Sequence, residues 1–302
     1  MKILVHASAS CLLLFCIAAS ILAQSESQSD LQDSLDLRVM TWNIWHGGKE
    51  DGAEVGPKRV AEIIRESGAD IIALQETYGS GEWLAKELGF HFHSRGTNVS
   101  LLSRHEIVAD VSVNDAFNCV GAVIELPEGN RVVCYSIWLP YAEDIWVENA
   151  RKQVDVPKWL AACEPSRKKL EAIRDEIELK LRATKYDSLP IILAGDFNSM
   201  SHLDYVSSAV DQYQAEVDWP TSHMLVDHEY QDTYRSCNPK VDRRIDRTWS
   251  PRFPLQEQDR IDFIYIRDRA FQAVESKTID QHSIQFPSDH AAVLTRFRYL
   301  QD

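Results

Sequence analysis

Three features are missing from the 302-residue sequence, and each absence argues against a class of protein. No stretch after residue 23 is long and apolar enough to span a bilayer, so we expect no stable membrane anchor. No two cysteines have the Cys-x-x-Cys spacing, which argues against a zinc site. Positive charge is in deficit: the formal charge of −14 argues against a protein that coats nucleic acid with its whole surface, although it permits a local basic groove.

The N-terminus has a pattern typical of export. Residues 1–23 contain a short apolar run that ends in the small residue Ala23, and we interpret them as a signal peptide that is cleaved there. A membrane anchor is the alternative, but the apolar run is short and interrupted by serines. Residues 24–36 are polar, and we expect a flexible linker. The protein is therefore predicted to be secreted or periplasmic.

Four cysteines follow the predicted signal peptide, namely Cys119, Cys134, Cys163 and Cys237. Export permits disulfides without requiring them, and four cysteines allow three pairings. The sequence does not choose among these pairings.

The stretch from Leu189 to Asn198 organises the rest of the chain. Its unbroken apolar run predicts a strand that is buried on both faces. We expect Gly195 to let the backbone turn where this strand stops. Asp196 and Asn198 then supply a carboxylate and an amide at a rigid strand end, which suits the activation of water beside a phosphate. A simple Asx turn is the alternative.

Polar residues of the same kind adjoin four other predicted strands. Asn43 ends the first strand and Glu76 follows the second, while Asp262 lies near the start of a late strand. Asp289 and His290 precede the last strand. Carboxylate and amide oxygens suit Mg²⁺, Mn²⁺ or Ca²⁺ better than a soft metal. Each residue alone is more often a cap, but five such elements together indicate one site.

The remaining segments predict a mixed α/β fold. Residues 99–139 are rich in strands and turns, which is typical of antiparallel pairing. Residues 144–184 have a helical pattern with one apolar stripe, which should pack on the outside of a sheet. Residues 199–258 show few periodic runs. We interpret them as a substrate-facing lid, and the alternative is a surface insertion with local helices.

The order of these motifs resembles the endonuclease/exonuclease/phosphatase superfamily, which has the DNase I-like fold. The motifs are Thr-Trp-Asn at 41–43, Gln-Glu at 75–76, Gly-Asp-Phe-Asn at 195–198, Arg-Ile-Asp-Phe at 260–263 and Ser-Asp-His at 288–290. The resemblance, to a secreted bacterial-type member, implies a single domain over 37–302. It also implies an α/β (α+β) fold: a four-layer α/β/β/α sandwich of two mixed sheets packed face to face, with helices outside.

The resemblance implies a metal site for Mg²⁺ or Mn²⁺. Glu76 would be the main ligand, with Asn43 beside it and Asp289 nearby. Such an ion would neutralise oxygens of a phosphate ester during in-line hydrolysis.

Four further residues acquire catalytic roles by the same resemblance. Asp196 would orient and deprotonate the attacking water, and Asn198 would donate a hydrogen bond to the developing charge on the phosphate. Asp262 would hold His290 in one tautomer, and His290 would stabilise the phosphoryl oxygens.

The sequence departs from the superfamily pattern at Trp138, where a histidine or tyrosine usually contacts the phosphate. An indole N–H donates a hydrogen bond but carries neither a proton for transfer nor a charge. Tyr141, Arg243 or Arg247 could supply the missing contact. Trp138 as an ordinary core residue is the alternative.

We expect a metal-dependent phosphoesterase, most simply a nuclease-like phosphodiesterase acting as a monomer. The partner would be a phosphate ester, possibly nucleic acid. Six arginines could form its basic groove, although interleaved aspartates could neutralise them; they are Arg235, Arg243, Arg244, Arg247, Arg252 and Arg260. The alternatives are a sphingomyelinase-like enzyme, a small-molecule phosphodiesterase or phosphatase, and a binding protein that has lost catalysis.

Overall fold

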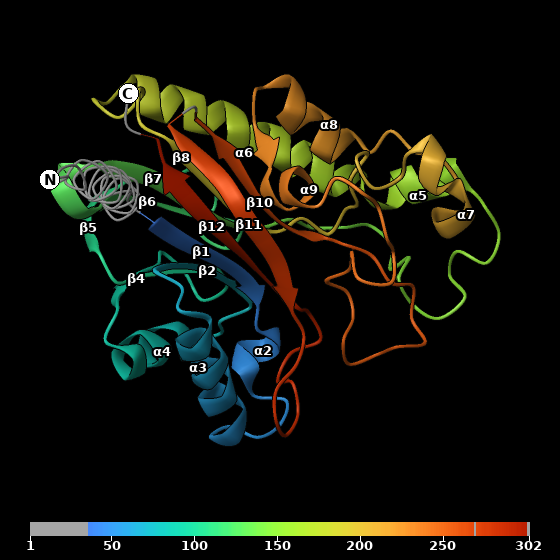
Figure 1. Cartoon of the computed structure of the whole chain (residues 1–302), viewed down its shortest axis with the longest axis horizontal. Coiled ribbons are helices and arrows are strands. Elements are labelled where there is room, and N and C mark those ends of the chain that lie inside the picture. The colour runs from blue at the N-terminus through green and yellow to red at the C-terminus, as the bar shows by residue number, and fades with distance from the viewer. Residues whose placement is uncertain (1–35, 269, 301–302) are drawn as a thin grey trace, which may run out of the picture.

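The computed structural model describes residues 36–268 and 270–300, so the predicted signal peptide and nearly all of the predicted linker lie outside the described residues (Figure 1). The chain forms two six-stranded sheets. The first has the order β11-β12-β1-β2-β4-β3 and the second has the order β5-β6-β7-β8-β10-β9. In Figure 1, helices α3 and α4 lie on one side of the strands and α6 and α8 lie on the other. The predicted sandwich of two mixed sheets with outer helices is confirmed.

The strands of the first sheet are β1 (Asp36–Asn43), β2 (Ile71–Gln75), β3 (His91–His93), β4 (Ser100–Ser103), β11 (Phe271–Ile279) and β12 (Ala292–Tyr299). Those of the second sheet are β5 (Glu106–Asp110), β6 (Cys119–Glu125), β7 (Arg131–Trp138), β8 (Ile191–Asp196), β9 (Gln231–Asp232) and β10 (Asp262–Arg267). The helices are α2 (Trp45–Gly48), α3 (Val55–Ser67), α4 (Ser80–Leu88), α5 (Val156–Ala162), α6 (Glu164–Arg182), α7 (Val210–Tyr213), α8 (Pro220–Asp227) and α9 (Thr233–Cys237). Short 3₁₀ turns occupy η1 (Pro127–Gly129) and η2 (Ser207–Ala209).

Each sheet is built around one parallel pair. β1 pairs in parallel with β2, and α3 lies between them in the chain. β7 pairs in parallel with β8 after a connection that contains α6. The other strand pairs are antiparallel. Because parallel strands end at the same edge, each sheet presents two strand ends together.

The core explains why the central strands have no polar alternation. Leu37 and Val39 of β1 pack with Ile192 and Ala194 of β8 between the two sheets. The alternate residues of β1, such as Met40, pack instead against α3 and α4. Both faces of each central strand are therefore buried, which is the environment that selects continuous apolar runs. The predicted apolar stripe of α6, including Leu170 and Ile177, covers the outer face of the second sheet.

Three local predictions were wrong. The helix predicted over 144–184 begins only at Val156, because Asp155 accepts a hydrogen bond from the backbone of Lys158 and caps α5 there. Residues 199–258 are not without regular structure: they contain short helices and a local core in which Trp219 is fully buried, as in the alternative of an insertion with local helices, although Trp249 of this segment lines the cavity described below. Gly195 lies inside β8 without a positive φ, so it does not turn the chain.

Two further findings concern the described residues only. Their four cysteines are all free, and three of these are buried. None of their helices has the length and apolarity needed to cross a membrane.

The role of Gly195 is to let β8 approach β7. A Cβ at this position would lie 2.1 Å from the carbonyl oxygen of Ile137.

We expect Gly195→Ala to lower the free energy of unfolding by about 1–3 kcal/mol through overpacking, measured by urea denaturation. Gly79→Ala is the control, because its Cβ would meet no atom within 4 Å and only its left-handed φ of 86° is strained. An unchanged urea midpoint for Gly195→Ala would contradict this account.

Candidate active site

The topology gathers the predicted site residues at one edge of the sandwich. β1 and β8 end there with Asn43 and Asp196, while β10 begins there with Asp262. The strand register sets Asp196 opposite Asp262 on one side and Trp138 on the other. β12 runs antiparallel to β1, so His290 reaches the same edge just before that strand begins.

Asp196 is the centre of the hydrogen-bond network. Its carboxylate accepts hydrogen bonds from the side chain of Asn43 at 3.0 Å, from the backbone of Asn198 at 2.9 Å and from the side chain of Asn198 at 3.2 Å. The second amide hydrogen of Asn198 is directed at the carbonyl of Leu139, 2.9 Å away. Asn198 therefore orients Asp196 in this arrangement, and neither of its amide hydrogens is free for the phosphate contact that was predicted.

Asp262 and His290 form a buried pair behind this network. The Nδ1 atom of His290 lies 2.9 Å from Asp262 Oδ2, and its Nε2 atom lies 3.9 Å from Asp196 Oδ2. Burial acts to lower the pKa of His290, but the two carboxylates outweigh it and raise that pKa well above its ordinary value. Burial, reinforced by Asp262, raises the pKa of Asp196 to about 7. A base with a pKa near neutrality is well matched to proton transfer.

A threonine fixes the start of β10. The hydroxyl of Thr248 accepts hydrogen bonds from the backbone N–H groups of Ile261 and Asp262. Next to it, the ring of Trp249 contacts the ring of His290 edge-on. Thr248 and Trp249 thus hold the Asp262–His290 pair from a segment that sequence reasoning had assigned to a lid.

Glu76 and Asp289 line the cavity in front of Asp196. The Oδ1 atom of Asp289 is buried without a hydrogen-bond partner among the described residues. Burial raises the pKa of Asp289 to about 6, and the negative charge of Glu76 adds to this effect. Glu76 adopts a left-handed φ of 54°, and its backbone N–H is held by Asn98.

Asn43 does not face this cavity as an oxygen ligand. Its amide nitrogen donates to Glu76 at 3.1 Å and to Asp196 at 3.0 Å, while its oxygen accepts from the backbone of Trp45. The observed orientation suits two neighbouring carboxylates, because the reverse orientation would set three oxygens together. The geometry therefore gives the predicted metal ligand Asn43 a different task, which is to link two acids.

The cavity has a volume of about 200 Å³ and an aromatic wall. Trp138, Tyr141, Trp146 and Trp249 line it together with the acids and His290. Among the described residues, no lysine or arginine lines it. The indole N–H of Trp138 is buried without an acceptor in this part of the chain, and Phe117 contacts the ring edge-on.

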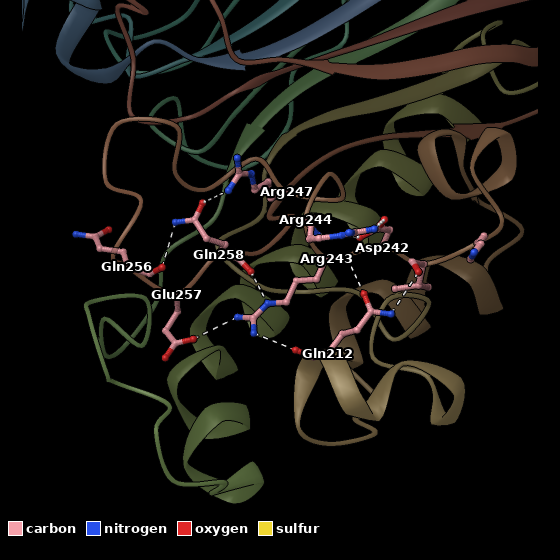
Figure 2. A pocket seen from close by; sticks show the side chains of 10 residues that line it. Gln212, Asp242, Arg243, Arg244, Arg247, Gln256, Glu257 and Gln258 are labelled. Carbon is pink, nitrogen blue, oxygen red and sulfur yellow. Dashed lines mark hydrogen bonds and ion pairs between the residues drawn. The ribbon is translucent and has the colours of Figure 1, made fainter.

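Arg243 and Arg247 lie elsewhere. Figure 2 shows them in a second cavity, of about 660 Å³, with Gln212 and Glu257. Arg243 bonds to Glu257 and to backbone carbonyls, and Arg247 bonds to the side chain of Gln258. The structure thus separates both arginines from the aromatic cavity, whereas it places Trp138 and Tyr141 on that cavity's wall.

The six arginines predicted for a basic groove are mostly paired with acids, and three of them, Arg243, Arg244 and Arg247, line the second cavity with Lys240. Five of the six arginines form salt bridges with carboxylates, which agrees with the alternative that acidic residues neutralise them. These are Arg235, Arg243, Arg244, Arg252 and Arg260. The interleaved aspartates and more distant acids neutralise them.

His46 is a site residue that sequence reasoning missed. It lies in α2, a four-residue segment directly after β1 whose backbone is not helical at His46 and Gly47, so we call it the loop α2. His46 lines the cavity beside Glu76. The available signal was the Gly47-Gly48 pair, which marks a tight turn immediately after the Thr-Trp-Asn motif.

A sequence model described as the Endonuclease/Exonuclease/phosphatase family matches residues 40–290. The chain belongs to this family. The family predicted from the five motifs is therefore confirmed, and members of its superfamily are phosphoesterase hydrolases.

Several known proteins resemble this chain in sequence or in fold. An uncharacterized protein of Caenorhabditis elegans is 27% identical over 295 residues, which cover 87% of this chain and 92% of that protein. A family protein of Bacteroides thetaiotaomicron has a similar fold, with a TM-score of 0.63, 14% identity, and coverage of 89% of this chain and 100% of that one. Truncated Caenorhabditis elegans TDP2 gives a TM-score of 0.61 at 14% identity, covering 87% and 98% of the two chains.

The donor set fits the hard cation that the family implies. Glu76 and Asp289 offer carboxylate oxygens to one cavity, and Asp289 has a buried oxygen that no other group binds within the described residues. Asp196, Asp262 and His290 also offer atoms within 4.8 Å of one another. However, Asp262 is already bonded to His290 in that cluster. The cavity with Glu76 and Asp289 is therefore the better site for an ion.

The raised pKa of Asp289 predicts how stability depends on pH. Its folded-state pKa of about 6 lies above the ordinary value of 3.8. The folded state therefore binds more protons than the unfolded state between these values, and wild-type stability falls as the pH rises through this window. With chelator present, we expect Asp289→Asn to be more stable than wild type at about pH 8 and equal to it near pH 4.

Urea denaturation across this pH range measures the difference, with the exposed Asp187→Asn as control. A difference that stays constant with pH would contradict the assignment of the effect to Asp289 ionisation.

Proposed function

We propose that the protein is a metal-dependent phosphodiesterase that hydrolyses its substrate by in-line attack of water. One observation supports this most directly. The buried carboxylate of Asp196, oriented by Asn43 and Asn198, lines the same cavity as Glu76 and as the unpartnered oxygen of Asp289. A positioned base next to a cation site is what water activation requires.

Each residue of the site has a distinct task in this proposal. Asp196 receives the proton of the attacking water, and its pKa of about 7 suits this transfer at neutral pH. Asp262 keeps His290 oriented and favours its protonated form, which stabilises negative charge on the phosphoryl group. The buried indole N–H of Trp138 offers a neutral hydrogen bond to a phosphate oxygen.

Glu76 and Asp289 would hold a divalent cation. When bound, such an ion supplies charge neutralisation at the phosphate oxygens. We propose Mg²⁺ or Mn²⁺ for this role.

The substrate proposed is a small phosphodiester with a single negative charge. The cavity of about 200 Å³ has no lysine or arginine among its described lining residues, so little would balance the extra charge of a monoester or polyphosphate. Its tryptophans suit an ester with a flat or apolar substituent.

Single-stranded DNA is a second candidate. Danio rerio TDP2, with a TM-score of 0.59, has been solved in complex with a single-strand DNA product. The aromatic wall of the cavity would accept a stacked base at a strand end without a basic groove.

We further propose that the enzyme is exported and acts as a monomer. The proposal of export is supported by the apolar pattern of residues 1–23 and by the polar linker after it.

The proposed mechanism predicts metal-dependent hydrolysis of bis-p-nitrophenyl phosphate. We expect activity with Mg²⁺ or Mn²⁺, none with chelator, and a fall in kcat of about 10²–10⁴-fold in Asp196→Ala because the general base is lost. Release of p-nitrophenol measures the rate, and Asp187→Asn is the control. Absence of hydrolysis with every metal would contradict the catalytic proposal and favour a binding protein.

Neutralisation of the arginines predicts discrimination against duplex DNA. We expect plasmid DNA to stay uncut under conditions in which the small ester is hydrolysed, and Arg247→Gln to leave the kcat/KM for the ester unchanged. Gel electrophoresis over a range of salt concentrations measures cleavage. Duplex cleavage with a steep dependence on salt would show phosphate contacts and would restore the nuclease prediction.

A further inference from the structure

We propose that His46 is a ligand of the metal ion, with its Nε2 atom and Glu76 Oε2 bound to the same ion. The inference rests on the metal dependence proposed above and deepens it, because it specifies the class of ion. The ion would be held by the imidazole of His46 and the carboxylate of Glu76, with Asp289 lining the same cavity.

The distances around His46 fit this role. Nδ1 of His46 lies 2.7 Å from Glu50 Oε1, which fixes the ring orientation and leaves Nε2 for another partner. Nε2 lies 4.0 Å from Glu76 Oε2. Two ligand atoms each about 2.1 Å from one ion lie at most about 4.2 Å apart, so one ion can bind both atoms. A carboxylate behind a histidine is the usual support of a metal-binding imidazole.

The loop α2 is built to hold His46 over Glu76. Trp45 and His46 both have left-handed backbones, with φ of 51° and 48°, although neither is glycine. Three hydrogen bonds keep the loop in place: Trp45 N–H to Asn43 Oδ1, His46 N–H to Glu76 Oε2, and Gly47 N–H to the carbonyl of Glu76. Strained backbone of this kind persists where the surroundings enforce it, and it is common at ligand sites.

The packing leaves this loop no room to relax. A Cβ on Gly47 would lie 2.8 Å from the carbonyl oxygen of Thr77, and one on Gly48 would lie 2.8 Å from Val60. The fold thus presses the loop against the segment that carries Glu76. His46 still has a side chain that is 58% exposed, so it reaches the open side of the cavity.

The role of Asn43 strengthens the case for His46. The oxygen of Asn43 is bonded to Trp45, so the amide gives the ion no ligand in this arrangement. His46 supplies a nitrogen donor next to the other carboxylate oxygen of Glu76, Oε2, instead. A mixed nitrogen and oxygen donor set favours Mn²⁺ over Mg²⁺, because Mg²⁺ prefers oxygen ligands and water.

The alternative is a salt bridge in which His46 connects Glu50 and Glu76 and binds no ion. Electron spin echo envelope modulation (ESEEM) of bound Mn²⁺ separates the two cases, because it detects directly coordinated imidazole nitrogen and does not depend on activity. The probe is Mn²⁺ alone, added to the purified protein. We expect nitrogen modulation in wild type and its loss in His46→Asn, since asparagine tolerates the left-handed backbone but has no imidazole.

Isothermal titration provides a second readout. We expect His46→Asn to weaken Mn²⁺ binding by at least ~10-fold and Glu50→Gln to weaken it by about 10-fold, with a smaller loss for Mg²⁺. His223→Ala is the matched control. His223 also bonds to a carboxylate, that of Asp218, but it lies in α8 and does not line the aromatic cavity.

The outcomes separate this inference from the proposed function. If Mn²⁺ binds and supports hydrolysis but wild type shows no nitrogen modulation, the role of His46 is overturned and the phosphodiesterase proposal stands. The same conclusion follows if the modulation persists in His46→Asn and disappears in His290→Asn. If Mn²⁺ does not bind and no metal supports hydrolysis, both fail. Modulation lost only in His46→Asn supports the inference.

Discussion

The hydrogen bond from Asn43 to Asp196 joins the two sheets at the edge where the site forms. Asn43 ends β1 in the first sheet, and Asp196 ends β8 in the second. Asn43 also donates to Glu76, so one amide connects the carboxylates of Asp196 and Glu76. A buried carboxylate is costly unless it is hydrogen-bonded, and the partners of Asp196 come from strands that the core already holds at fixed register. The catalytic geometry therefore depends on the packing of the sheets against each other.

A second polar cluster supports the start of β10. Arg260 is fully buried and bonds to Asp204 and Asp232, while Arg235 bonds to Asp204 and Asp246. Removing one partner of such a cluster leaves a buried charge uncompensated and costs about 3–5 kcal/mol. Arg260 therefore holds the insertion 199–258 against the strand that carries the histidine's partner, Asp262, whereas Arg235 links parts of the insertion to each other. The positive charge of both arginines is paired within the fold.

The central strands and the polar residues at their ends could be predicted from the sequence because of how these strands are buried. Strands buried on both faces must be continuously apolar, so an acid such as Asp196 or Glu76 directly after one is conspicuous. Side-chain orientation is not encoded in this way: the amide of Asn43 turns its nitrogen to the acids because two carboxylates converge there, and that convergence exists only in the folded chain. The same limit applies to Arg243, because a count of charges does not reveal which ones pair. His46 escaped prediction because the Gly47-Gly48 pair indicates a turn but does not indicate which cavity the preceding side chain faces.

The aromatic wall and the missing basic residues have a common consequence for chemistry. With Trp138 in place of a titratable residue, the cavity's described lining offers the phosphate one cationic group, the imidazolium of His290, which Asp262 holds in place. Electrostatic stabilisation then depends on the cation more strongly than in a site lined by arginine. A low-dielectric wall strengthens each remaining charge interaction, so the tryptophans partly compensate for the cations that are absent. In the proposed function, a site of this composition suits a diester of low charge, because an ion held by Glu76 and its neighbours would supply most of the neutralising charge.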